Sequence, residues 1–371
     1  MLLTLTLVAH ALTPTQSGGR GVDSLAINAA FAATGGNVST RGAFTAGSAA
    51  GNFRIIATSD SLADTASVTV TAPAAEISPG IAAAASAAPA GQSTPFGPFD
   101  VWSGSTPKPH TDSFTLVVGG VNAGSIIGRI GAVRSRGLRL LTNMTGGAHA
   151  KYKTDGVFDI LKWEAAMSAY NTPAIKTAVA EAVADGTFLG NILMDEPANT
   201  SRENSWGPAG TMNKARVDSM AAYAKAIFPT LPMGVTLDYR VWNKRSFRVI
   251  DFQVSQYRHA KGSVSAYRAG ALALGARDGH AIVFSMNILD GGIPGSTCPI
   301  PETGGAGTYG RNCRMTPEQL LDYGAVLGSA GCAFLLWRYD SAFMVQTENQ
   351  QALDELAGRL AVDPAQSCRR L

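Results

Sequence analysis

The sequence predicts a multidomain protein: a small all-β sandwich at the N-terminus, followed by an α/β domain with the architecture of a (β/α)₈ barrel. Three observations support this prediction. The 371 residues exceed the length of one average domain. Every Trp, Tyr and Cys lies after residue 97, and residues 1–97 hold only seven charged residues. Short strand-like segments precede residue 72, whereas strands alternate with amphipathic helices after residue 96.

The predicted domain boundaries are 1–72 and 96–371, joined by a linker over 73–95. The linker segment contains four prolines, nine alanines and one charge, so it has no apolar face to bury. A short Ala-rich helix over 81–88 is the alternative. At the start of the chain, apolar and Thr residues alternate over 3–7, which favours a strand over a degenerate secretory signal without a basic region. Because the front of this domain is short, we expect a truncated start.

In the first domain, segments of four to eight residues alternate with Gly- or Asp-containing turns, as in NFRIIATS and ASVTVTA. The stretch AATGGNVSTRGAFTAGSAAGNFRIIATSDSLADTASVTVTA (32–72) resembles the bacterial immunoglobulin-like (Big) repeats of secreted and surface proteins. That resemblance implies a β-sandwich that acts as a spacer or adhesion module, with association at the cell surface or extracellular matrix. The domain has one His and no carboxylate pair, so we expect no chemistry there.

In the second domain, strand-like and helical segments alternate, which indicates a parallel sheet with helical crossovers. The expected strands cover 98–102, 115–120, 138–144, 188–195, 233–239, 251–257, 281–289 and 332–339. The expected helices cover 125–137, 174–186, 213–228, 264–279 and 317–331. Thr316, Pro317 and Gln319 form a helix-start signature with a capping box. A doubly wound open sheet is the alternative, weakened because no G-x-G-x-x-G turn is present.

Several function classes are disfavoured by composition and motifs. Charged residues make up 15% and the net charge is +3, which disfavours a nucleic-acid-binding face. The apolar run at the N-terminus is about a dozen residues, too short to span a membrane. The chain has no G-x-S-x-G elbow and no H-E-x-x-H, and its five histidines are scattered. We therefore expect no metal and no cofactor.

Polar and aromatic residues recur where the predicted strands end, the edge at which barrel enzymes carry their chemistry. Carboxylates and amides bind sugar hydroxyls, and aromatic faces stack on sugar rings. The candidate ligand-binding residues are Trp102, Asn143, Tyr239, Gln256, Tyr257, Asn287, Trp337 and Asp340, with Trp206 in the long polar loop 201–211. Packing in the barrel mouth is the alternative for Trp337, and a turn for Asn143.

The strongest local signal is LGNILMDEP (189–197), in which an apolar strand runs directly into Asp195, Glu196 and Pro197. It resembles the end of the fourth strand in TIM-barrel glycoside hydrolases, which implies that Glu196 is the general acid/base with Asp195 beside it. Capping of the next helix is the alternative for this pair. The retaining clan of that type has a Glu nucleophile after strand seven, where this chain has Asn287.

A second catalytic carboxylate is therefore sought elsewhere on the rim. Asp238 is the best candidate, followed by Asp340 and Asp290, and pairing with Arg240 or Arg245 is the alternative role for Asp238. The sequence therefore does not decide between a retaining and an inverting mechanism of glycoside hydrolysis.

The four cysteines all lie in the second domain. We expect Cys298 to pair with Cys313 around a Gly-rich segment, and Cys332 to pair with Cys368 near the C-terminus, although three pairings are possible and free thiols are the alternative. Two disulfides imply an oxidising compartment. The resulting hypothesis is a secreted or surface glycoside hydrolase with a carbohydrate substrate. The alternatives are a barrel that binds glycan without cleaving it, and a hydrolase of a non-sugar polymer.

Overall fold

The computed structural model of the chain describes residues 4–6, 30–39, 43–45, 51–59, 62–70, 93–146, 149–200, 205–293, 313–361 and 366–370. The chain forms two compact units, Met1–Ala84 and Ala85–Leu371, and each is described by itself.

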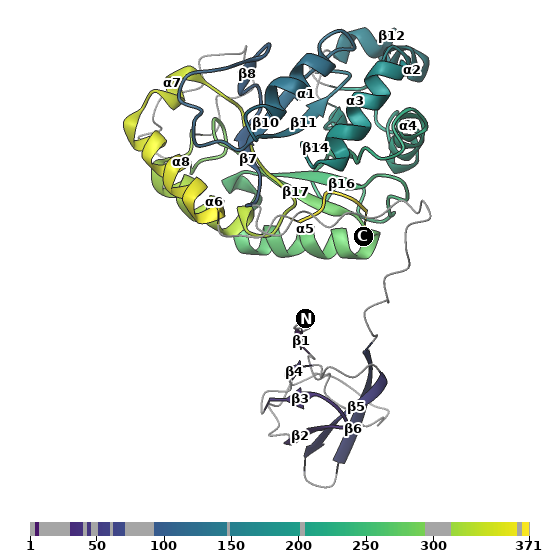
Figure 1. Ribbon diagram of the computed structural model, residues 1–371, viewed down its shortest axis with the longest axis vertical. Helices are drawn as coiled ribbons and strands as arrows, with labels where there is room; N and C mark the ends of the chain where they lie inside the picture. The colour runs from purple at the N-terminus through teal and green to yellow at the C-terminus, as the bar shows by residue number, and fades with distance from the viewer. Residues whose placement is uncertain are drawn as a thin grey trace. The chain divides into compact units, whose positions relative to one another are not determined.

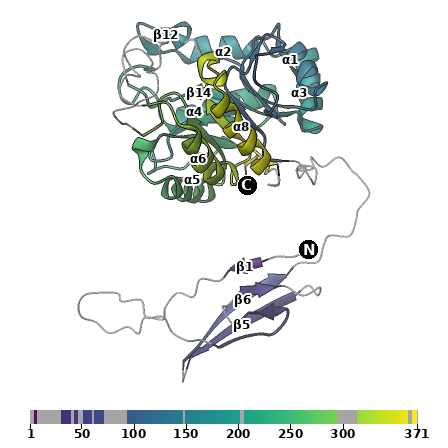
Figure 2. The ribbon, with the colours of Figure 1, turned by 90° about the vertical axis from the view of Figure 1, so that its left-hand side faces the viewer.

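The first unit is built of short antiparallel strands. One sheet has the order β1 (Thr4–Thr6), β4 (Ala43–Thr45), β3 (Asn37–Val38), and the other β2 (Ala30–Ala33), β5 (Gly51–Ser59), β6 (Leu62–Val70). β5 and β6 form a long hairpin whose register runs from Gly51 opposite Val70 to Ser59 opposite Leu62 (Figure 2). The all-β prediction is confirmed for the described residues. The immunoglobulin-like arrangement stays a prediction.

The second unit contains an eight-stranded sheet within its described residues (Figure 1). Its strands are β7 (Phe96–Pro98), β10 (Leu116–Gly120), β11 (Arg139–Asn143), β14 (Phe188–Asp195), β15 (Met233–Thr236), β16 (Phe252–Tyr257), β17 (Ala281–Asn287) and β18 (Phe334–Trp337). All neighbouring strands are parallel and follow chain order from β10 to β18, with β7 beside β18. A parallel bridge between Phe99 and Val118 joins the two end strands, so the sheet is a nearly closed (β/α)₈ barrel.

The first barrel strand ends earlier than the sequence predicts. The expected strand covered 98–102, but Asp100 has φ of 58°, in the left-handed region that turns the chain out of the sheet. Trp102 consequently belongs to a small hairpin, β8 (Trp102–Ser103) with β9 (Thr106–Pro107), and not to the barrel.

The helices lie around the sheet, as the periodicity predicts (Figure 1). They are α1 (Ile126–Arg134), α2 (Ile160–Ser168), α3 (Pro173–Ala184), α4 (Lys214–Ile227), α5 (Val264–Asp278), α6 (Pro317–Gly328), α7 (Ser341–Met344) and α8 (Thr347–Leu360). The capping box predicted at Thr316 and Gln319 is present. α2 and the β12–β13 hairpin (Lys153–Thr154, Val157–Phe158) were not predicted.

The apolar core has two parts, one inside the barrel and one between the sheet and its helices. The interior cluster includes Leu141, Ile192, Val254, Val283 and Leu335, and the outer cluster is larger. Outside the barrel, α6 and α8 lie side by side (Figures 1 and 2). A Cβ at Gly324 would come within 2.5 Å of the Leu356 side chain, which would then have to shift.

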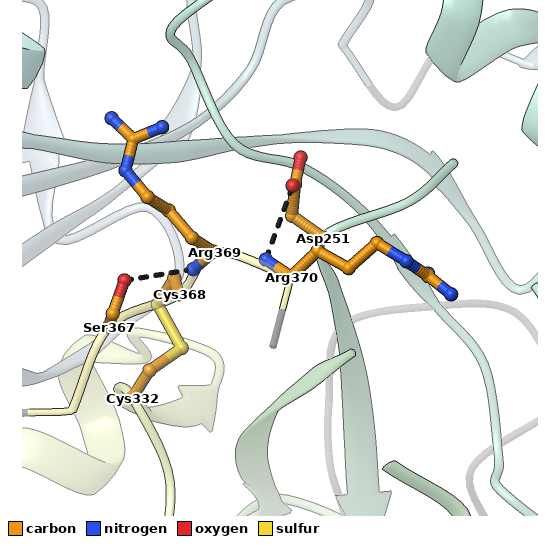
Figure 3. Close-up of a disulfide and its surroundings, with 6 residues drawn as sticks. All are labelled: Asp251, Cys332, Ser367, Cys368, Arg369 and Arg370. Carbon is orange, nitrogen blue, oxygen red and sulfur yellow. Dashed lines mark hydrogen bonds between the residues drawn. A yellow bond between two sulfur atoms is a disulfide. The ribbon is translucent and has the colours of Figure 1, made fainter. Parts of the chain in front are cut away.

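Near the C-terminus, Cys368 is bonded to Cys332, and the backbone N–H of Arg370 donates to Asp251 Oδ1 (Figure 3). The predicted disulfide between Cys332 and Cys368 is present, and both cysteines belong to the interior cluster. Arg370 donates hydrogen bonds to the backbone carbonyls of Phe247, Ile250 and Asp278. Cys313 is also disulfide-bonded, and Cys298, its expected partner, lies outside the described residues.

Candidate active site

Four of the predicted ligand-binding residues lie on strand positions that face the barrel axis. Along a strand, every second side chain points to the same face of the sheet. Asn143, Gln256 and Trp337 lie two residues beyond the interior residues Leu141, Val254 and Leu335. Asn287 lies four residues beyond the interior residue Val283. These residues come from four strands and form the last interior layer before the carboxyl rim.

A β-bulge in the fourth barrel strand turns Asp195 into the same layer. Ile192 packs inside the barrel, whereas Leu193 and Met194 both belong to the outer cluster. Between Ile192 and Asp195 the pairing of β14 with β15 changes register, and Asp195 then lies opposite Thr236. A bulge of this kind re-aims the side chain that follows it, and bulges are frequent next to active sites.

The two carboxyl groups at this strand end differ in environment. Burial and the neighbouring charge of Glu196 raise the pKa of Asp195 to about 7, although the Thr236 side chain acts in the opposite direction. Glu196 itself is exposed. An acid with a raised pKa next to a second carboxyl group is a recurrent feature of hydrolytic sites.

The backbone at Glu196 has an unusual conformation. Its φ is 38°, in the left-handed region that few residues other than glycine adopt. The local turn is held by Asn199, whose amide N–H donates to the Glu196 carbonyl at 2.8 Å and whose Nδ2 donates to Glu196 Oε2 at 3.2 Å. Such strained positions cluster at functional sites.

Trp206 is buried and supports the end of the fourth barrel strand through a hydrogen bond. It is 3% exposed, and its Nε1–H donates to the carbonyl oxygen of Asp195 at 2.8 Å. The ring stacks on His149 at 4.0 Å and meets Phe158 edge-on. The stacked His149 covers one face of the ring, and a role of Trp206 in substrate binding stays a prediction.

Asp238 follows the fifth strand and is an ion-paired carboxylate. Its side chain contacts Arg240 at 2.8 Å and Lys261 at 2.7 Å. Burial raises the pKa of Asp238, but the hydrogen bonds and charges of these two cations outweigh it and hold the pKa at about 2. Asp238 is thus ionised near neutral pH, and the pairing with Arg240 that the sequence left open is present.

Three other aromatic candidates occupy structural positions. Trp102 is 6% exposed, lies outside the eight barrel strands and has the Arg136 guanidinium 5.0 Å from its ring. Tyr257 is 1% exposed, and its hydroxyl donates to the Gly262 carbonyl at 2.7 Å. Tyr239 packs edge-on against Tyr267 of α5. All three rings make packing contacts outside the barrel interior, and their roles in substrate binding stay predictions.

The seventh and eighth strand ends complete the rim. Asn287 is buried, and its Oδ1 accepts the amide N–H of Asp290 at 2.9 Å. Asp290 is buried and lies 3.0 Å from Arg258, so this carboxylate is also ion-paired. Trp337 is partly exposed, meets Phe99 edge-on at 5.2 Å and precedes a cis peptide bond to Arg338. Of the predicted aromatic residues, Trp337 is best placed to meet a ligand.

Asp340 has a capping role in addition to its place on the rim. Its Oδ1 accepts the Phe343 amide N–H at 2.8 Å at the start of α7, and lies 3.4 Å from Nη2 of Arg314. The sequence reasoning did not single out Arg258 or Arg314. Arg258 comes directly after the end of β16, a position that offered a signal, whereas Arg314 had none.

Within the described ranges, no group of three His, Cys, Asp or Glu side chains is arranged to hold a metal ion. A search of the same ranges finds no helix with the length and apolarity needed to cross a membrane.

Comparison with solved structures places the fold among glycoside-hydrolase-like TIM barrels. An endo-1,4-β-mannanase from Rhizomucor miehei matches with a TM-score of 0.51 and 11% identity, over 72% of this chain and 95% of that one. A family 10 xylanase from termite gut that contains a bacterial Ig-like domain has a TM-score of 0.43 and 10% identity, over 90% and 93%. An endo-1,4-β-mannanase from Eisenia fetida has a TM-score of 0.42 and 10% identity, over 72% and 92%.

At these identities the likeness concerns the fold alone. No protein-family model matches the sequence. No curated protein matches it either.

Proposed function

We propose that the barrel is a glycoside hydrolase whose general acid is supplied by Asp195 and Glu196. The observation that supports this most is the pair of adjacent carboxyl groups at the end of the fourth barrel strand, one of which keeps its proton to about pH 7. A glycosidase needs a carboxylic acid that is protonated at working pH, so that it can protonate the leaving oxygen.

Within this pair, Glu196 is assigned as the group that reaches the glycosidic oxygen, because it is the exposed member. Asp195, beside it, is the member whose pKa is raised to about 7. Trp206 holds the Asp195 carbonyl and Asn199 holds Glu196, which positions the pair. Trp337 and the interior amides Asn143, Gln256 and Asn287 are proposed to bind the sugar.

Asp238 is proposed as the second carboxylate, acting as base or nucleophile. Its ionised state suits either role. Both of its oxygens are engaged, Oδ1 by Arg240 and Oδ2 by Arg240 and Lys261. For Asp238 to accept a proton from the attacking water, or to attack the sugar itself, one cation has to move away.

That engagement favours a second candidate function, glycan binding without cleavage. On the seventh strand the end residue is the amide Asn287, and Asp290 beyond it is paired with Arg258. A barrel of this kind would retain Trp337 and the amides for binding but would lack a free base.

The deciding experiment is a hydrolysis and binding screen on polysaccharides, beginning with β-1,4-mannan. Wild type, Glu196→Gln, Asp195→Asn and Asp238→Asn are compared, with Glu181→Gln on the exposed face of α3 as the matched control. We expect Glu196→Gln and Asp195→Asn to lose about 10²–10⁴-fold in kcat, the range for general acid catalysis, and the control to lose nothing. Equal hydrolysis by wild type and Glu196→Gln would contradict the assignment. Binding without hydrolysis by wild type would support the second function.

The cellular setting is also a proposal. The disulfide between Cys332 and Cys368 supports an oxidising compartment, and we propose a secreted or surface-attached protein. The N-terminal β-unit is proposed to act as a spacer or adhesion module. Its test is binding of the separate barrel and full chain to the same glycan, with equal affinity expected if the unit is only a spacer.

A further inference from the structure

A small pocket lies beside the rim, between the segment that leads into α6 and the α7–α8 region. Its volume is about 220 Å³, and its polar wall consists of Arg314, Thr316, Gln346, Glu348 and Asn349. It adjoins the candidate site because Arg314 contacts Asp340, which follows Trp337 by three residues. The volume is below the roughly 300–1,000 Å³ of pockets that hold drug-sized ligands, so it suits a single small group such as one sugar unit.

Arg314 is buried in this pocket with hydrogen-bonding capacity that the protein does not use. It is 3% exposed, and in the described part of the chain its Nε and Nη1 have no hydrogen-bond partner. Its single ion pair is to Asp340, at 3.4 Å, through an oxygen that already accepts the Phe343 amide N–H. A buried donor without an acceptor is costly, so an acceptor oxygen brought by a ligand would be strongly favoured.

The other polar residues that line the pocket mostly make hydrogen bonds within the protein. Asn349 Nδ2 donates to the Phe343 carbonyl and to Gln346 Oε1, and Thr316 Oγ1 accepts the Gln319 amide N–H. Glu348 is exposed, so solvent screens its charge. Arg314 is therefore the group in this wall that determines what binds.

We propose that Arg314 binds the carboxylate of an acidic sugar unit, and that the barrel accordingly acts on or binds a uronic-acid-containing glycan. The inference rests on the proposed function, because it places a subsite next to the proposed sugar-binding rim. A planar guanidinium with free N–H groups matches a carboxylate better than a neutral hydroxyl does. The long contact with Asp340 leaves the guanidinium charge only partly compensated.

The test measures binding of sodium D-glucuronate and of D-glucose to the full chain by calorimetry. We expect glucuronate to bind at least tenfold more tightly than glucose, and Arg314→Met to lose at least tenfold in glucuronate affinity. Arg314→Lys should retain part of that affinity. Arg359→Met, on the exposed part of α8, is the matched control and should bind as wild type does. Equal binding of the two sugars, or unchanged binding in Arg314→Met, overturns the proposal.

Two further points of the design separate this proposal from the hydrolase assignment and from a failure of the variant to fold. Glucuronate binding is measured without any hydrolysis step, so a failure of the hydrolase assignment leaves this result unaffected. If Arg314→Met does not fold, a wild-type crystal soaked with glucuronate replaces it. Density for the carboxylate against Arg314 supports the proposal, and density elsewhere or none overturns it.

Discussion

Replacing Asp195 by Asn should change how the stability of the protein depends on pH. In the fold, burial and the charge of Glu196 raise the pKa of Asp195 to about 7 from 3.8. Ionised Asp195 therefore destabilises the folded state. The difference in pKa corresponds to about 4 kcal/mol, since each pKa unit is about 1.4 kcal/mol.

The sign follows from proton binding. Below pH 4 the carboxyl is protonated in both states, so it contributes no difference. Between about pH 4 and 7 the folded state binds more protons than the unfolded state, so this group lowers stability as pH rises. Above pH 7 the loss is complete. Relative to wild type, Asp195→Asn should therefore gain up to about 4 kcal/mol on going from pH 4 to pH 8.

The assay is urea unfolding of wild type and Asp195→Asn at pH 4, 5.5, 7 and 8.5. A constant offset from lost contacts does not matter, because only the pH dependence of the difference is compared. Asp112→Asn, at an exposed carboxylate, is the matched control. In a Glu196→Gln background the effect should shrink, since one cause of the raised pKa is removed. A stability difference that stays constant from pH 4 to 8.5 would refute the raised pKa.

Three further predictions concern stability and the rim. Burial lowers the pKa of His280 to about 4 from 6.5. As pH falls from 6.5 to 4, the free energy of unfolding of the wild type should therefore drop by about 3 kcal/mol relative to that of His280→Phe, as measured by urea unfolding. A difference in stability that does not change with pH would contradict this prediction. Replacing Cys332 and Cys368 by Ala removes a cross-link between residues 36 positions apart and should lower the free energy of unfolding by about 4 kcal/mol, as measured by guanidinium unfolding. An unchanged unfolding midpoint would show that the disulfide does not stabilise the fold. Lys261→Met leaves Asp238 with Arg240 alone, so its pKa should rise, as read by carboxyl NMR titration; no rise would show that Lys261 does not hold it.

Much of the barrel was predictable because its signals are local. Apolar runs of strand length alternate with helix-length amphipathic segments, and β14 has the predicted bounds, Phe188–Asp195. The capping box at Thr316 uses residues three apart, so it too can be recognised without tertiary information. The disulfide partner of Cys368 followed from position in the chain. The missed α2 begins after an Asp159 cap that has no Glu or Gln at the third helical position to mark it.

The roles of the rim residues were only partly predictable, because they depend on contacts between distant segments. Trp102, Trp206, Tyr239 and Tyr257 have the right residue type, but neighbours from other elements cover or engage their rings. Asp238 has the right charge, but Lys261, from beyond the next strand, pairs with it. No local sequence pattern predicts contacts between residues that are this far apart in the chain.

By itself, the sequence determined the order of strands and helices, the division into a β-unit and a barrel, and the carboxyl pair at the end of the fourth strand. These depend on side-chain periodicity and on residues adjacent in the chain. Tertiary structure decided which side chains face the barrel axis, that Asp195 keeps its proton near pH 7 while Asp238 stays ionised, and that Arg314 is buried beside the rim. Burial and charge pairing are set by residues far apart in the chain, and only the closed barrel brings them together.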